Sequence, residues 1–305
     1  MKKYYILFLL PLLISFASCG FDDEEAEFPV KKVLFTYQKY NRQLVVGEGL
    51  EMKVGVVFAG LPKSDRDRVV EYVIDPSLVT DSRQTVLPTD YYKFDDPSQI
   101  IIPKGQLKGY MPVRIDSAKF VNDPKALTGE YILPVRIVKA DADAITEGKG
   151  YTLISVSYQG KQYGNYEYSG VRTNSATQEQ QQYANVKTVT NSIRQLQTVG
   201  PDTFRVYADQ QGTNDPAKGQ YSFLITLPVK GSGQVTIAKD PDYLPGIEVE
   251  ADGESTYDAD TKTFVLRYKY TQNGVEWKTV DRMTFRNRIR DDQGDGRVLY
   301  EWRGF

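Results

Sequence analysis

The chain has 305 residues with 38 basic and 40 acidic side chains, so its formal net charge at pH 7 is −2. This nearly equal number of basic and acidic side chains argues against nucleic acid or an anionic membrane surface as a partner, because both call for a clustered basic face. The sequence has no histidine and one cysteine, which excludes Ser-His-Asp and Cys-His catalysis, imidazole metal ligation and an internal disulfide.

The N-terminus has the pattern of a secretory signal. Lys2 and Lys3 precede an apolar run from Ile6 to Ile14, and small residues follow the run up to Ser18. The run is well short of the roughly 20 apolar residues that a membrane-spanning helix needs, and no later stretch is longer. We therefore predict a signal peptide over residues 1–18 and membrane contact through lipid alone.

The segment Phe16-Ala17-Ser18-Cys19 resembles the bacterial lipobox, in which the cysteine is acylated and becomes the first mature residue. The alternative is an ordinary secretory signal with an incidental cysteine. An acidic run from Asp22 to Glu25 follows, so residues 19–30 are predicted to be a lipidated Cys19 and a solvated tether. An acidic run at this place also resembles the surface-export signal of Bacteroidota lipoproteins. That resemblance implies an outer-membrane protein exposed at the cell surface.

Residues 31–160 show the two-residue hydrophobic period of half-buried strands. The alternation is clearest over Leu50–Phe58, Tyr131–Val138 and Thr152–Tyr158. Pro134 lies inside the second run, and because proline cannot donate to a strand ladder it predicts an edge strand or a bulge. Turn-forming groups separate the runs, and about seven strands over roughly 125 residues are typical of an immunoglobulin-like β-sandwich.

Residues 159–165 contain two glycines and no apolar run, which predicts a domain boundary. Residues 161–305 are then predicted to form a second antiparallel β domain, either a sandwich or a calycin-like barrel, since strand periodicity does not separate the two. A Gln-rich segment at 175–182 is read as a loop or one helical turn. The predicted strands lie at 186–190, 204–208, 221–227, 234–238, 263–270 and 276–285.

Several motifs resemble one known family. Leu87-Pro88-Thr89-Asp90-Tyr91-Tyr92, Ile101-Ile102-Pro103-Lys104-Gly105 and Tyr131-Ile132-Leu133-Pro134-Val135 resemble the N-terminal domain of glycan-utilisation-locus lipoproteins of Bacteroidota. Thr256-Tyr257-Asp258 and the run Thr263–Tyr270 are similar to the C-terminal domain that often accompanies it. The resemblance implies an all-β protein whose immunoglobulin-like domain stands near the membrane, with a role similar to that of SusE- and SusF-type glycan-binding proteins.

Trp277 and Trp302 are the first candidates for ligand contact, because an indole face can stack on a pyranose ring while its N–H bonds a hydroxyl. Trp277 is in phase with polar residues of its strand, which predicts the wetter face. Tyr163 and Tyr166 are further candidates, because they lie around the predicted hinge, where ligand clefts often form. For all four residues the alternative is core packing.

No sequence pattern predicts catalysis or metal binding. Residues Asp291–Gly296 resemble the start of a calcium loop, but Trp302 stands where an EF-hand places its bidentate glutamate, so we predict a solvated turn and no metal site. Carboxylates are plentiful, yet no nucleophile elbow, phosphate loop or metal-ligand cluster is visible. We predict no catalytic residue, no cofactor and no enzyme activity.

The sequence thus predicts an all-β surface lipoprotein that binds an oligosaccharide or polysaccharide and presents it to a SusC/SusD-like outer-membrane importer. The tether joins the first domain, so the second is expected to lie farther from the membrane. The second domain also holds both tryptophans, so it is expected to bind the glycan. One alternative is a structural or adhesive surface protein with no glycan ligand. Another is a hydrolase, which two carboxylates about 5 to 9.5 Å apart in a cleft would indicate.

Overall fold

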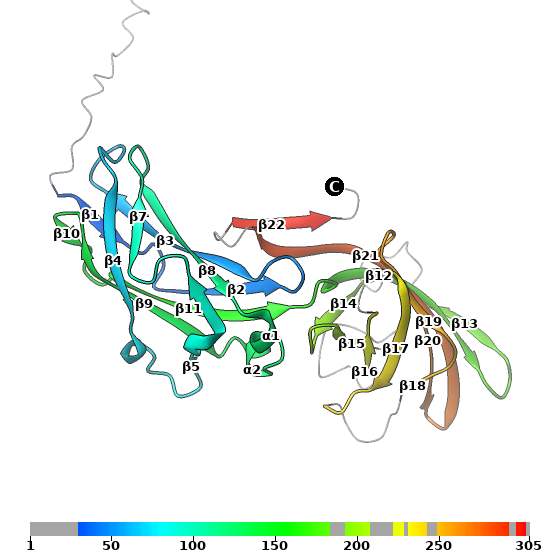
Figure 1. Ribbon diagram of the computed structural model, residues 1–305. Helices are drawn as coiled ribbons and strands as arrows, with labels where there is room; N and C mark the ends of the chain where they lie inside the picture. The colour runs from blue at the N-terminus through cyan, green and yellow to red at the C-terminus, as the bar shows by residue number, and fades with distance from the viewer. Residues whose placement is uncertain are drawn as a thin grey trace, which may run out of the picture.

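The computed structural model describes residues 30–183, 193–207, 222–228, 231–242, 249–292 and 297–302. The predicted signal peptide, Cys19 and the acidic tether lie outside these ranges. Within them no helix is long and apolar enough to cross a membrane. The described chain is built almost entirely of strands in two groups, which confirms the predicted all-β class (Figure 1).

The first group of strands forms two sheets that enclose one hydrophobic core. One sheet contains, in spatial order, β10 (Ala144–Ile145), β1 (Lys32–Leu34), β3 (Glu51–Ala59), β8 (Lys108–Ile115) and β6 (Tyr92–Phe94). The other contains β2 (Lys39–Val45), β11 (Tyr151–Gln159), β9 (Tyr131–Ala140), β4 (Arg68–Ile74) and β7 (Gln99–Ile102), with β5 (Thr85–Val86) beside β9. The short helical segments are η2 (Pro76–Leu78), η3 (Thr89–Tyr91), α1 (Ser117–Phe120) and α2 (Lys125–Thr128).

Strand β3 shows why the alternating pattern folds as it does. Its even-numbered residues are all buried, with Met52 and Val56 at 0 % exposure, whereas Lys53 and Gly55 belong to the opposite, partly exposed face. Successive side chains of a strand point to opposite faces, so the period of two buries one face only. Each buried aliphatic side chain contributes roughly 1.5–3 kcal/mol of transfer free energy. The strand predicted from Leu50 to Phe58 is therefore confirmed.

Pro134 corrects one expectation. It lies in β9, which has neighbours on both sides, so it is not on an edge strand. On one side β9 pairs with β11. On the other side its partner changes around Pro134, because β5 pairs with Tyr131 and Ile132 and β4 pairs from Val135 onward. A residue without an N–H is tolerated in a central strand at such a gap in the ladder.

The second group closes into a barrel. Eight strands pair antiparallel in a ring, because the last of them pairs back with the first. In order they are β12 (Gly164–Asn174), β14 (Ile193–Thr198), β15 (Thr203–Tyr207), β16 (Ser222–Thr226), β17 (Gly233–Lys239), β19 (Ser255–Asp258), β20 (Thr263–Gln272) and β21 (Val275–Asp292). Strands β13 (Gln180–Tyr183), β18 (Val249–Ala251) and β22 (Arg297–Trp302) pair outside the ring.

The barrel resolves the alternative that strand periodicity left open. Residues 164–174, which we did not predict as a strand, form the strand that closes it, and part of the Gln-rich segment forms β13. The predicted strand at 186–190 lies outside the described residues. The barrel interior is filled by aromatic side chains that are 2 % exposed or less, among them Tyr166, Phe223, Phe264 and Tyr268. A small barrel filled in this way is a packed core.

A charged side chain joins the barrel to the first domain. Nη2 of Arg288 lies 2.8 Å from Oε1 of Glu48, and its Nη1 donates a hydrogen bond to the carbonyl of Lys161 at 2.6 Å. The ring of Phe204 lies against Gly160, where a Cβ would stand 2.4 Å from Cζ. These contacts tie the end of the first domain to one mouth of the barrel.

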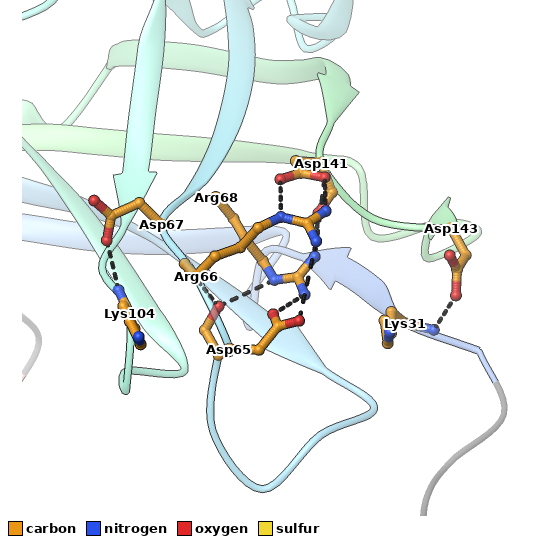
Figure 2. A network of polar contacts seen from close by, with 9 residues as sticks. Lys31, Asp65, Arg66, Asp67, Arg68, Lys104, Asp141 and Asp143 are labelled. Carbon is orange, nitrogen blue, oxygen red and sulfur yellow. Dashed lines mark hydrogen bonds and ion pairs between the residues drawn. The ribbon is translucent and has the colours of Figure 1, made fainter.

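At the N-terminal end of the first domain, a polar network fixes the point where the chain enters (Figure 2). Arg68 is 1 % exposed, its guanidinium lies 4.1 Å from the centre of the Phe58 ring, and its Nη1 donates to the carbonyl of Asp141 at 2.8 Å. The amide of Lys31 donates to Oδ2 of Asp143 at 2.8 Å. A buried guanidinium needs such partners, so we assign this network to structure.

Candidate functional site

A groove of about 410 Å³ opens on the first domain where β1 leaves β3. Strand β1 pairs with β3 only at residues 57–59, and after Leu34 the chain crosses to the other sheet, where β2 pairs with β11. Toward Glu51, the described strand pairings of β3 are with β8 alone. We call this hollow the tyrosine groove; its tyrosine and cationic lining residues are Tyr37, Tyr40, Arg42, Lys53, Lys108 and Tyr110.

Two of the tyrosines expose much of their surface. Tyr37 is 67 % exposed and Tyr110 is 43 % exposed. Tyr110 packs against the neighbouring strand at Gly55, where a Cβ would stand 2.8 Å from Cε1 of the ring. Aromatic rings are usually buried because they carry a large apolar surface, so two exposed rings in one groove are an informative exception.

The charges of the tyrosine groove are all positive. Arg42 lies over the Tyr40 ring, with its guanidinium carbon 4.6 Å from the ring centre. Lys53 and Lys108 form no ion pair with any residue that the structure describes. None of the described residues that line the groove is a carboxylate. Its polar side-chain groups are therefore tyrosine and threonine hydroxyls and cationic donors.

A second hollow, the junction cavity, lies where the barrel mouth meets the first domain and has a volume of about 620 Å³. Tyr166, Tyr257 and Phe285 form an aromatic wall, and among the described lining residues Asp202 supplies one carboxylate. Burial raises the pKa of Tyr257 above its ordinary value. Tyr166 donates its hydroxyl hydrogen to the carbonyl of Gln162 at 2.7 Å, so this group is already engaged.

The structure places Trp277 in the barrel core, at 8 % exposure, so the expected position on the wetter face is wrong. The residues in phase with it are polar but inward-facing: Thr279 is 2 % exposed and Asp281 is 0 % exposed, whereas Val280 of the other face is 38 % exposed. The guanidinium of Arg172 lies 4.3 Å from the centre of a Trp277 ring. Its indole thus offers no open platform.

Polar residues of β21 can face the barrel interior because the charge of Asp281 is compensated by a buried arginine. Nη1 of Arg194 lies 2.8 Å from Oδ2 of Asp281, and the Tyr268 hydroxyl donates to the same oxygen at 2.7 Å. The guanidinium of Arg194 also lies 3.7 Å from the centre of the Tyr168 ring. Burial, followed by the charge of Asp281, raises the pKa of Tyr268 well above its ordinary value. The group is sealed from solvent, so we assign it to structure.

The remaining sequence candidates lie around residues 285–288 of β21. Tyr163 is 8 % exposed beneath Arg288, and Tyr166 is 1 % exposed in the wall of the junction cavity. The backbone of Trp302 lies on β22 opposite Asn287, and its side chain lies outside the described residues. Tyr163 and Tyr166 thus lie near Arg288 at the junction, whereas Trp277 lies in the barrel core. The exposed tyrosines of the first domain, which we did not predict, are the ones that line a groove.

Comparison with known proteins matches both parts of the chain. Residues 28–144 match a family model for an N-terminal domain, and residues 152–285 match one for a C-terminal domain. No curated protein matches.

Among solved structures, a Bacteroides ovatus protein of unknown function is 19 % identical with a TM-score of 0.68, covering 90 % of this chain and 99 % of its own. An auxiliary nutrient binding protein from Bacteroides thetaiotaomicron is 14 % identical with a TM-score of 0.48, covering 88 % of this chain and 97 % of its own. The first likeness shows that the fold is shared over nearly the whole of both chains.

Proposed function

We propose that this chain is a lipid-anchored cell-surface protein that binds a glycan in the tyrosine groove and presents it to a SusC/SusD-like importer, without chemistry of its own. The observation that carries the proposal is the pair of exposed rings, Tyr37 and Tyr110, in one surface groove. The resemblance of the sequence motifs to glycan-utilisation lipoproteins supports the same reading.

The physical argument rests on what a sugar offers. A pyranose has an apolar C–H face, which packs on an aromatic ring, and a rim of hydroxyls, which bond to polar tips such as the tyrosine hydroxyl. The groove lies at the surface of the first domain, so a polymer longer than the groove can continue into solvent. This proposal places the site in the first domain and not in the second, because Trp277 is buried.

The anchor is part of the same proposal. An extended tether from Cys19 to Val30 would span at most roughly 35–40 Å. The first domain, and the groove with it, would then stand within reach of an importer in the same membrane. Replacing Cys19 by Ala should release the protein from the membrane fraction, and lipid-labelled protein persisting in that variant would contradict the anchor.

A binding role also suits the distribution of carboxylates. Two-acid glycoside hydrolysis needs two carboxyl groups about 5 to 9.5 Å apart across a bound sugar. Among the residues that the structure describes, no carboxylate lines the tyrosine groove, and one, that of Asp202, lines the junction cavity. We therefore propose recognition and not cleavage.

The test is affinity electrophoresis, followed by calorimetry, against a panel of plant, host and microbial polysaccharides. We expect wild type to bind at least one polymer and the double variant Tyr37→Ala/Tyr110→Ala to bind it at least tenfold more weakly with an unchanged melting temperature. The matched control is Val69→Ala/Val138→Ala, which removes exposed apolar groups from the other sheet. If the protein binds no polymer of the panel, the structural or adhesive alternative is favoured. If the double variant keeps full affinity, the binding site lies outside the tyrosine groove.

A further inference from the structure

We infer that the tyrosine groove selects acidic glycans, meaning chains that carry carboxylate or sulfate groups. This inference rests on the proposed function and names the substrate class of the same site. It follows from the cations that the fold brings to the groove and from the lack of an ion-pair partner for Lys53 and Lys108 among the described residues.

Three strands each contribute one cation. Arg42 comes from β2, Lys53 from β3 and Lys108 from β8, so residues far apart in the sequence converge on one hollow. The net charge of the whole chain is −2, so a local cluster of cations does not follow from composition. A groove lined by charges of one sign raises the local concentration of oppositely charged ligands.

The cross-strand pairs of β3 and β8 show which cations have an acidic partner and which do not. On the outer face, Glu51 pairs with Arg114, and these two side chains form an ion pair, with Nε and Oε2 3.1 Å apart. Asp95 is a second acidic partner of Arg114. The arginine just outside the groove is thus fully compensated.

The next pairs on the same face are different. Lys53 faces Pro112, Gly55 faces Tyr110 and Val57 faces Lys108. Neither lysine meets a carboxylate among the described residues. Two lysines therefore flank the Tyr110 ring along the face, an arrangement that places a stacking surface between two points of positive charge. A sugar ring on Tyr110 would carry its acidic substituents toward these ammonium groups.

The two kinds of contact respond differently to salt. Attraction between an exposed ammonium group and a bound anion is screened, because the Debye length falls from about 10 Å at 0.1 M salt to about 3 Å at 1 M. Stacking on tyrosine has no such dependence. Binding through the tyrosine groove should therefore weaken as salt is added, and retain a salt-independent part.

The experiment compares matched polymers. Calorimetry on the full chain uses polygalacturonate and its carboxyl-reduced form, and dextran sulfate and dextran, each at 50 and 500 mM NaCl. We expect at least one acidic polymer to bind at least tenfold more tightly than its neutral counterpart at low salt. Lys53→Gln/Lys108→Gln should reduce that preference at least fivefold, whereas Lys63→Gln/Lys93→Gln, the same charge change at exposed lysines outside the groove, should not.

The outcomes separate the two proposals. Equal binding of neutral and acidic polymers, abolished by Tyr37→Ala/Tyr110→Ala, would overturn the acidic class and leave glycan binding intact. Silence toward these and all other polysaccharides would overturn both. Equally tight binding of oligothymidylate or of anionic phospholipid vesicles would show a general polyanion surface and would also overturn the inference.

Discussion

The ring of Tyr110 stands against Gly55 of the neighbouring strand, where a Cβ would lie 2.8 Å from its Cε1 and 3.0 Å from its Cδ1. The two residues are direct cross-strand partners. Real Cβ atoms do not come this close to a neighbour, so the position of the ring depends on the missing side chain. Gly55 thus supports the exposed tyrosine of the groove without touching a ligand itself.

Gly55→Ala should therefore displace the Tyr110 ring and weaken glycan binding severalfold. The strand itself should tolerate the change, because Ala is favoured over Gly in a strand interior by roughly 0.5–1 kcal/mol. The measurement is the dissociation constant of whichever polysaccharide wild type binds, alongside the melting temperature. A variant with full affinity would show that the ring position is irrelevant to binding.

The buried pair Arg194–Asp281 should be essential to the barrel. Asp281→Leu would leave an unpaired guanidinium in the core, and breaking a buried pair in this way costs about 3–5 kcal/mol of unfolding free energy. The control is Glu250→Gln, which breaks the exposed pair with Lys269 and should cost about 1 kcal/mol or less. Urea denaturation measures both. Equal effects of the two substitutions would contradict the assignment of Arg194 and Asp281 as the structural pair.

Trp277→Ala should destabilise the barrel by about 3–5 kcal/mol, because the side chain is 8 % exposed and its removal leaves a cavity. An exposed ligand platform would behave differently, losing affinity without stability. Thermal and urea unfolding of the variant therefore distinguish the core position from the surface position that the sequence suggested. An unchanged melting temperature would contradict the structure here.

Asp123 should give the first domain part of its acid sensitivity. Hydrogen bonds from Tyr131, and further from the Lys125 amide and Tyr91, hold the pKa of this carboxyl below its ordinary value of 3.8. A lowered folded-state pKa means that the unfolded chain binds the proton more readily. The stabilisation is therefore complete above the unfolded-state pKa and is lost as the pH falls through the folded-state pKa.

Unfolding free energies of wild type and Asp123→Asn, measured at pH 7 and at pH 3, test this linkage. We expect the variant to be less stable at pH 7 and the difference between the two proteins to shrink at pH 3. A difference that stays constant with pH would show that the charge of Asp123 contributes nothing to the stability.

The sequence predicts the strands better than their partners. The alternation over β3 reports burial of one face, which is a local property, whereas β9 and β11 are buried on both faces over much of their length. Closure of the barrel depends instead on pairing between β12 and β21, more than a hundred residues apart, and no local period encodes it. The same limit applies to the groove, because the contact of Tyr110 with Gly55 exists only in the β3–β8 register.

Polarity misled the choice of site residues for a separate reason. Thr279 and Asp281 suggested a wet face for their strand, but the barrel buries that face and compensates Asp281 with Arg194. A buried ion pair inverts the usual relation between polarity and exposure, and its partner lies on another strand. The exposed Tyr37 and Tyr110 carried no distinguishing signal among 22 tyrosines.

The most direct test of glycan binding in the tyrosine groove is fluorine NMR of the protein labelled with 3-fluorotyrosine. Tyr37→Phe and Tyr110→Phe assign the resonances of the two exposed groove tyrosines, and Tyr268→Phe assigns a ring buried in the barrel. When a polysaccharide that wild type binds is titrated in, we expect the resonances of Tyr37 and Tyr110 to shift saturably and the resonance of Tyr268 to stay unchanged. Saturable binding that leaves both groove resonances unmoved would contradict the account.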